Sequence, residues 1–252
     1  MLIEQTLNQL RALRLLGMAQ SIEDQRLSTE LQSLSFDERI GMAVDIEVQQ
    51  RETRKLNRLI KQAKFKHDAA PEDINYRSKR GLDRQVIANL LSSDYLQNKQ
   101  NIIFTGPTGV GKTWLACALG QQAVRRSYPV LYTRLSRLIE DIDIARGDGS
   151  LPQLRRNISK KSLLILDDWA LSPLTKSARH ELLEIIDDRL GNSSLMITSQ
   201  LPIEKWHEYL GEATIADAIL DRIVHQSHII KLEGESMRKK MSPLKNKEAD
   251  NE

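Results

Sequence analysis

The chain has 252 residues and a mass of 28.8 kDa, and with 40% apolar, 28% charged and 4% aromatic residues it is predicted to be a soluble, helix-rich protein rather than a disordered or fibrous one. The net charge of +3 permits a nucleic-acid partner without requiring one, and a single cysteine excludes a disulfide framework. No apolar run approaches the ~20 residues of a membrane span, so we expect a cytoplasmic protein without a membrane partner.

The first part of the chain predicts a small all-helical N-terminal domain over residues 1–67, followed by a linker over residues 68–75. No proline occurs before Pro71, where small and acidic residues gather. Ser35 followed three residues later by Glu38 is a capping-box pattern, in which each side chain satisfies a backbone donor of the other residue. A long helix is therefore expected to begin there.

That predicted helix carries a basic face. At 100° per residue, five basic side chains fall on one arc: Arg51, Arg54, Lys55, Arg58 and Lys61. A solvated surface is the plain alternative, because helices often carry such faces without any ligand. However, Glu52 is the only acidic residue between Arg51 and Lys66, so the charges lack acidic neighbours along this stretch. We therefore favour contact with DNA phosphates.

The rest of the chain, residues 76–252, alternates short β-rich runs with helical patterns. The runs are residues 101–105, 130–133, 162–167, 194–198 and 228–232. This alternation predicts an α/β domain with a parallel sheet and helices on both faces, whose ligand binds at the carboxyl ends of the strands. Only about 20 residues follow the last run, too few for a separate helical lid.

A phosphate-binding loop follows the first β-rich run and opens a helix, as the G-x-x-x-x-G-K-T pattern requires. Its residues are Gly106, Pro107, Thr108, Gly109, Val110, Gly111, Lys112 and Thr113. The glycines let backbone N–H groups surround the phosphates of ATP. Lys112 is expected to reach the β- and γ-oxygens, and Thr113 to offer its hydroxyl to Mg²⁺.

Two carboxylates end the apolar run "LLILDDWA". Asp167 is placed to hold the Mg²⁺ shell, and Asp168 is a candidate base for the attacking water. The next run delivers Thr198, Ser199 and Gln200 beside these carboxylates, a polar group suited to orienting water near the γ-phosphate. The arrangement indicates hydrolysis.

Other nucleotide-binding classes fit less well. Partition ATPases place an extra lysine near the start of the loop, where this chain has Pro107 and Thr108, and transporters need an LSGGQ-like signature that is absent. A small-molecule kinase would carry an arginine-rich lid and remains the main enzymatic alternative. A nucleotide switch without hydrolysis is the other alternative.

Four further arginines are candidates for phosphate contact. Arg222 precedes the last run and is either an ordinary surface residue or an unpaired arginine that acts as a finger. Arg238, beside two lysines, either contacts phosphate or belongs to a solvated basic tail. Arg134 and Arg137 follow the second run and are expected to bind DNA. Without zinc-ligand spacing or a recognition-helix signature, DNA contacts should be mainly to phosphates.

Five segments carry a family resemblance: "GPTGVGKTWLACALGQQA", "LLILDDWA", "MITSQLPIEKWHEYLGE", "ATIADAILDRIVHQS" and "KLEGESMRKK". In their order and spacing they resemble the AAA+ ATPases of the initiator and helicase-loader clade, most closely the IstB-type ATPases that assist a transposase. The resemblance implies that residues 106–113 form Walker A and that Asp167 and Asp168 form Walker B. It also implies that Ser199 or Gln200 is the sensor. Arg222 would then be the arginine finger, and Arg238 the second sensor.

The resemblance also implies a function. The chain would bind ATP and Mg²⁺, form an ATP-dependent homo-oligomer on double-stranded DNA and remodel that DNA for an IstA-type transposase. Hydrolysis would reset the complex. A replicative helicase loader of the DnaC type is the alternative, and it would prefer single strands.

Overall fold

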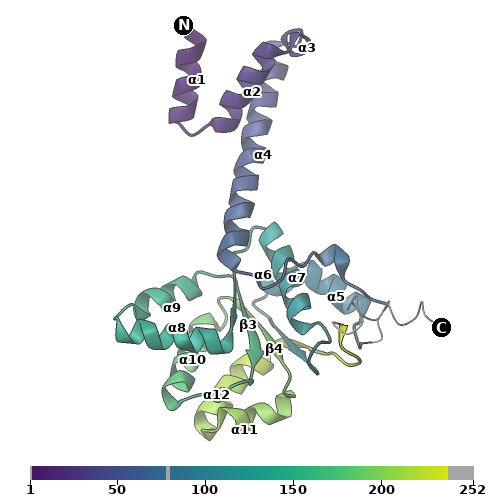
Figure 1. Ribbon diagram of the computed structural model, residues 1–252, viewed down its shortest axis with the longest axis vertical. Coiled ribbons are helices and arrows are strands. Elements are labelled where there is room, and N and C mark those ends of the chain that lie inside the picture. The colour runs from purple at the N-terminus through teal and green to yellow at the C-terminus, as the bar shows by residue number, and fades with distance from the viewer. Residues whose placement is uncertain (1, 78–79, 238–252) are drawn as a thin grey trace, which may run out of the picture. The chain divides into compact units, whose positions relative to one another are not determined.

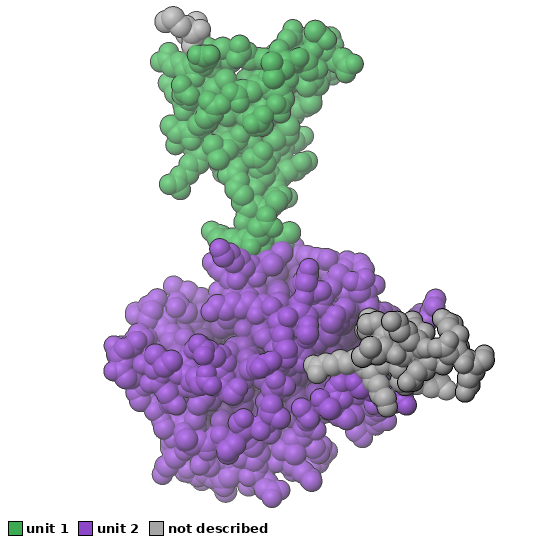
Figure 2. Space-filling model, viewed as in Figure 1, with its two compact units in different colours: residues 1–58 green, residues 59–252 purple. Residues whose placement is uncertain are grey.

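The computed structural model describes residues 2–77 and 80–237. The chain divides into two compact units, residues 1–58 and residues 59–252, coloured green and purple in Figure 2. The predicted linker, residues 68–75, contains the short 3-10 helix η1 (Pro71–Asp73).

In its described residues the first unit contains only helical secondary structure, as predicted. Its helices are α1 (Leu2–Ala12), α2 (Leu16–Leu27), α3 (Thr29–Gln32) and most of α4 (Phe36–Ala63). The predicted capping box is confirmed at the start of α4. The Ser35 backbone N–H donates to Glu38 Oε2 at 2.8 Å, and the Glu38 N–H donates to Ser35 Oγ at 3.3 Å. Two backbone donors are thereby satisfied where the helix begins.

A buried carboxylate joins α4 to the first turn of α2. Glu47 Oε2 accepts hydrogen bonds from the backbone N–H groups of Gly17 at 2.7 Å and Met18 at 3.3 Å. A negative charge at this position also complements the positive end of the α2 dipole. A Cβ on Gly17 would lie 2.7 Å from the Glu47 Cα, so the close approach of the two helices requires glycine.

The second unit is built on a five-stranded parallel sheet with the strand order β2-β3-β4-β1-β5. The strands are β1 (Asn101–Thr105), β2 (Val130–Arg134), β3 (Leu163–Trp169), β4 (Ser194–Ser199) and β5 (Ser227–Lys231). All five predicted runs are confirmed, with ends that differ by up to two residues. Ile102 of β1 is in register with Met196 of β4 on one side and with His228 of the edge strand β5 on the other.

Helices cover both faces of this sheet (Figure 1). They are α5 (Arg84–Leu91), α6 (Asp94–Gln97), α7 (Lys112–Arg125), α8 (Leu135–Gly147), α9 (Leu151–Ser159), α10 (Lys176–Arg189), α11 (Trp206–Leu210) and α12 (Ala213–Val224), with η2 (Ile203–Lys205) before α11. Helices α8 to α12 pack on the face that includes Ile103, Leu164 and Ile197. Helix α7 packs on the other face, where its Gly120 lies against Ile165.

The sheet order positions the candidate site. Strand β1 lies between β4 and β5, and the glycine-rich loop follows it directly. The carboxyl ends of β1, β3 and β4 therefore meet at one edge, where a doubly covered parallel sheet binds its ligand. No helix among the described residues is long and apolar enough to cross a membrane. Residues 238–252 lie outside the described part of the chain, so the expectation of no full lid stays a prediction.

Candidate nucleotide-binding site

The glycine-rich loop has backbone conformations that suit phosphate binding. Gly106 has φ +140° and Gly109 has φ +83°, a region that side chains with a Cβ rarely adopt. A Cβ on Gly106 would collide with the Leu232 carbonyl, and one on Gly109 would collide with the Ser236 hydroxyl. The Met237 N–H also donates to Gly109 O at 2.8 Å, so the segment after β5 packs against the loop.

Lys112 begins α7 and places its ammonium over the loop. Its Nζ donates to Gly106 O at 2.7 Å and to Pro107 O at 2.8 Å. Burial lowers the pKa of Lys112, although the carboxylates of Asp167 and Asp168 act in the opposite direction. A cation close to the loop and to both carboxylates is where the β- and γ-oxygens of ATP require one.

Arg80 supports the loop from outside, a contact that sequence reasoning missed. Its side chain is 4% exposed, with Nη1 donating to Val110 O at 3.1 Å and Nη2 to Asn75 O at 3.0 Å. Burial lowers the pKa of Arg80. A Cβ on Gly111 would lie 2.7 Å from Arg80 Nη1, so the guanidinium fits because position 111 is glycine. No local pattern could have indicated this contact, which joins residues 30 apart.

Asp167 lies at the centre of a hydrogen-bond network and is 0% exposed. Its Oδ1 accepts from Thr113 Oγ1 at 2.7 Å and Thr198 Oγ1 at 2.5 Å. Its Oδ2 accepts from Tyr132 Oη at 2.6 Å and lies 3.6 Å from Lys66 Nζ. Burial alone would raise the pKa of Asp167, but the donated hydrogen bonds outweigh burial and lower it. The network therefore keeps a buried carboxylate charged.

Asp168 occupies an irregular point of β3. Its φ is +59°, and the pairing register with β4 shifts between Leu166 and Trp169. A regular strand would turn consecutive side chains to opposite faces, and a left-handed residue breaks that alternation. The Asp168 N–H donates to Thr198 Oγ1 at 3.2 Å, and its Oδ2 lies 3.5 Å from Arg134 Nε. Strained backbone of this kind often occurs at functional sites.

At the end of β4, the residue that contacts the two aspartates is Thr198, whereas the sequence pointed to Ser199 or Gln200 as the sensor. The Ser199 hydroxyl is buried, donates to Trp169 O at 3.1 Å and accepts from the Leu201 N–H at 3.0 Å. Gln200 is exposed. Thr198 is the residue of this group that contacts both aspartates. The alternation of side chains along β4 could have indicated this role of Thr198. Thr198 and Met196 are two residues apart and therefore lie on the same face of the sheet, the one that α7 covers.

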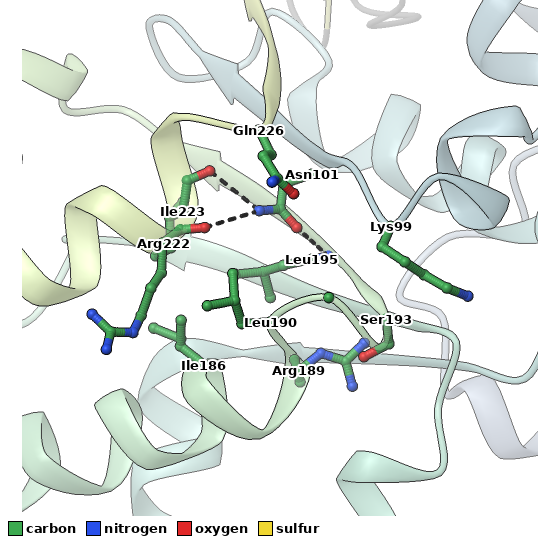
Figure 3. A pocket seen from close by; sticks show the side chains of 11 residues that line it. Lys99, Asn101, Ile186, Arg189, Leu190, Ser193, Leu195, Arg222, Ile223 and Gln226 are labelled. Atoms are coloured by element: carbon green, nitrogen blue, oxygen red, sulfur yellow. Dashed lines mark hydrogen bonds between the residues drawn. The ribbon is translucent and has the colours of Figure 1, made fainter.

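Arg222 lies away from this chain's own loop, in the last turn of α12. Figure 3 shows Asn101, the first residue of β1, donating to the carbonyls of Arg222 and Ile223, whereas the loop follows the other end of β1. The interpretation of Arg222 as unpaired is wrong. Its Nε forms an ion pair with Asp187, and its Nη1 donates to Ala218 O at 2.8 Å. Arg238 lies outside the described residues.

The predicted DNA contacts on α4 are exposed: Arg51, Arg54, Lys55, Arg58 and Lys61. One of them departs from the expectation that these charges lack acidic neighbours. Arg51 Nε lies 2.6 Å from Glu47 Oε1, one helical turn earlier, so its charge is partly neutralised. Glu47 lies before residues 51–66, the stretch in which the sequence has only one acidic residue.

The other two predicted DNA contacts, at the end of β2 and in the first turn of α8, also have acidic partners. Arg134 pairs with Asp168, and Arg137 Nη1 lies 3.0 Å from Glu140 and its Nε 3.2 Å from Asp141. Both arginine side chains are more than half exposed. They are therefore accessible, but neither is a free positive charge.

The residues fit a nucleotide with a divalent cation. Thr113 Oγ1 lies beside the charged Asp167 carboxylate at the start of α7, an oxygen pair of the kind that Mg²⁺ prefers. No group of three or more His, Cys, Asp or Glu residues forms a metal site in the described ranges. A magnesium ion here would therefore need phosphate oxygens and water to complete its shell.

Known proteins similar to this chain are described as ATP-binding proteins. A family model described as "IstB-like ATP binding protein" matches residues 8–245. The insertion-sequence ATP-binding protein y4pL of Sinorhizobium fredii is 47% identical over 239 residues, which cover 95% of this chain and 98% of that protein. The ATP-binding protein of insertion sequence IS1162 from Pseudomonas fluorescens is 50% identical over 203 residues, which cover 80% and 88%.

A solved structure of DnaI has the same fold. It superposes with a TM-score of 0.57 at 19% identity, covering 66% of this chain and 91% of that one. At this identity the likeness supports the fold alone. It confirms the prediction of a parallel sheet with flanking helices.

Proposed function

The chain belongs to the family of IstB-like ATP-binding proteins, and on that premise we propose that it is an ATPase that assists DNA transposition. It binds ATP with Mg²⁺, assembles into a homo-oligomer on double-stranded DNA and remodels that DNA for an IstA-type transposase. Hydrolysis then resets the complex. The observation that carries this proposal is the network in which Asp167 bonds Thr113 and Thr198, with Asp168 beside it.

Binding of ATP is supported by the loop and its lysine. Backbone N–H groups at the start of α7 face the phosphates, and the helix dipole favours negative charge there. Lys112 exchanges its carbonyl partners, Gly106 and Pro107, for β- and γ-phosphate oxygens. Thr113 and Asp167 would hold a magnesium ion, which would neutralise part of the phosphate charge.

Hydrolysis is assigned to Asp168. A water oxygen attacks the γ-phosphorus, the bond to the β-phosphate oxygen breaks, and ADP leaves with the electron pair. Asp168 accepts the proton of the attacking water. Thr198 donates its hydroxyl hydrogen to the Asp167 carboxylate and accepts the backbone N–H of Asp168, so it links the Asp167 carboxylate to the backbone that carries Asp168.

The oligomer is supported by the place of Arg222. This residue lies at the end of the sheet opposite the loop, so it does not serve the ATP of its own chain. Its side chain is 29% exposed, held by Asp187 at Nε and by Ala218 at Nη1. We propose that its remaining N–H donors contact the γ-phosphate bound by a neighbouring copy, where an arginine would stabilise the charge that develops in the transition state.

Two observations support DNA and a transposase as partners. The exposed basic face of α4 suits phosphate contact without sequence specificity. Relatives that cover nearly the whole chain are named as ATP-binding proteins of insertion sequences. A helicase loader is the second candidate, favoured by the fold likeness to a solved structure of the DnaC helicase loader. A preference for double strands over single strands separates the two.

The proposal is tested with Lys112→Ala, which removes the cation that binds the β- and γ-oxygens. We expect loss of ATP binding and, with it, loss of ATP-dependent assembly on duplex DNA, measured by sedimentation. Lys160→Ala, which removes an exposed lysine far from the loop in sequence, is the control and should assemble normally. ATP-dependent assembly that persists undiminished in Lys112→Ala would overturn the proposal.

A further inference from the structure

The second unit contains a cleft of about 760 Å³ beside the edge strand β2. Its charged lining is strongly one-sided, with five cations and one acid: Lys64, Lys66, Arg134, Arg137, Lys161 and Asp141. Uncharged polar groups, among them Gln62, lie between them. A concave surface of one charge sign focuses the field and concentrates counter-ions.

Two of these cations, Lys64 and Lys161, line the same cleft and repel each other electrostatically. Lys161 Nζ lies 3.4 Å from Gln62 Oε1, and burial together with the neighbouring Lys64 ammonium lowers the pKa of Lys161. Neither lysine forms an ion pair within residues 2–77 and 80–237. Two like charges held together without an anion are unfavourable, and a bound anion would relieve their repulsion.

The other three cations already have carboxylate partners. Lys66 lies 3.6 Å from Asp167, Arg134 lies 3.5 Å from Asp168, and Arg137 pairs with Asp141. They contribute to the positive potential of the cleft, but an incoming ligand would have to compete for them. An anionic ligand would therefore stabilise Lys64 and Lys161 more than the other three cations, which already have carboxylate partners.

We propose that this cleft binds the phosphodiester backbone of one strand of the DNA, with Lys64 and Lys161 as its principal phosphate contacts. The inference rests on the proposed function, because it assumes that the chain binds DNA. It differs from the sequence-based prediction, which placed the contacts of this region on Arg134 and Arg137. A backbone ligand fits a lining of flexible lysines, which act as point charges and carry no base readout.

The test compares matched double variants at saturating ATP. Lys64→Gln/Lys161→Gln removes both proposed contacts. Lys160→Gln/Lys176→Gln removes the same charge at two exposed lysines that do not line the cleft. Lys64→Arg/Lys161→Arg retains the charge. Tryptophan fluorescence confirms that each variant is folded.

Binding to duplex DNA is measured as a function of salt. Each lost phosphate contact should reduce the log–log salt slope by about 0.9, so the glutamine pair in the cleft should lose about 1.8. At 0.1 M salt the same change corresponds to roughly 60-fold weaker binding. The arginine pair should keep most of the wild-type slope.

The control pair, with its two charges removed outside the cleft, should lose much less. A cleft variant that matches this control in slope and affinity overturns the proposal, while the proposed function stands if wild type binds steeply. If the wild-type protein does not bind DNA at any salt concentration, both fail together. If polyglutamate binding depends on the two lysines and DNA binding does not, the cleft serves an acidic protein partner and the proposal is wrong.

Discussion

Replacing Tyr132 with phenylalanine tests the charged state of the Asp167 carboxylate. The change removes one hydroxyl, which donates to Asp167 Oδ2 at 2.6 Å, and keeps the ring. A hydrogen bond to a charged group contributes about 1.5–3 kcal/mol. Asp167 keeps the hydroxyl bonds of Thr113 and Thr198, so we expect the lower part of that range, about 1.5–2 kcal/mol of unfolding free energy at pH 7.

The loss should depend on pH. The pKa of Asp167 is lowered in the folded chain, so its contribution is full above the unfolded pKa of about 3.9 and is lost as pH falls through the folded pKa. The difference between wild type and Tyr132→Phe should therefore shrink below about pH 4. Urea unfolding followed by tryptophan fluorescence measures it, since Trp114, Trp169 and Trp206 all belong to the second unit.

Tyr209→Phe is the matched control for this measurement. Its hydroxyl donates to the neutral carbonyl of Ser172 at 2.8 Å, so the loss should be about 0.5–1.5 kcal/mol. It should also vary little across this pH range. If Tyr132→Phe destabilises by less than the control, or by the same amount at every pH, Asp167 is not a charged acceptor of this hydroxyl.

Three further predictions concern other parts of the chain. Glu47→Gln should lower the unfolding free energy of the first unit by about 1.5–3 kcal/mol, because a charged acceptor at the start of α2 is lost. Hydrogen exchange of the backbone N–H groups in the first turn of α2 should accelerate, and unchanged exchange would contradict this. Gly109→Ala should weaken ATP binding, because the left-handed conformation at this position costs a residue with a Cβ about 1–3 kcal/mol. Calorimetry measures the Kd, and an unchanged Kd would show that the loop adapts to the added Cβ. Neutralising Arg54, Arg58 and Lys61 should reduce the salt slope of DNA binding by about 0.9 per contact, and an unchanged slope would favour a solvated face.

The parts of the fold that the sequence predicted depend on local chemistry. Strands β1, β3 and β4 were visible because buried parallel strands form short continuous apolar runs. The start of α4 was visible because Ser35 and Glu38 satisfy each other's backbone donors within one turn. Likewise, the glycine-rich loop needs its glycines and Lys112 at fixed positions whatever surrounds it.

The contacts that were missed join residues far apart in the chain. Arg80 reaches the loop 30 residues later, and the partner of Arg222 is Asp187, 35 residues before it. Strand alternation could have placed Thr198 on the same face of the sheet as Asp167. Its second contact, with the backbone N–H of Asp168, depends on the irregular backbone at that residue, which no periodicity predicts.

The central claim is that neighbouring copies complete each other's ATP sites on DNA, and mixing two inactive variants tests it most directly. Arg222→Ala should bind ATP yet lose hydrolysis by roughly the 10³- to 10⁵-fold that an arginine finger contributes. Asp168→Asn should lose hydrolysis because it lacks the base.

In a mixture of the two variants, some sites combine an intact Asp168 with an intact Arg222 from the neighbouring copy. We predict that phosphate release reappears when the two inactive proteins are mixed with ATP and duplex DNA. A mixture that forms mixed assemblies on DNA and stays as inactive as either variant alone would contradict the shared site.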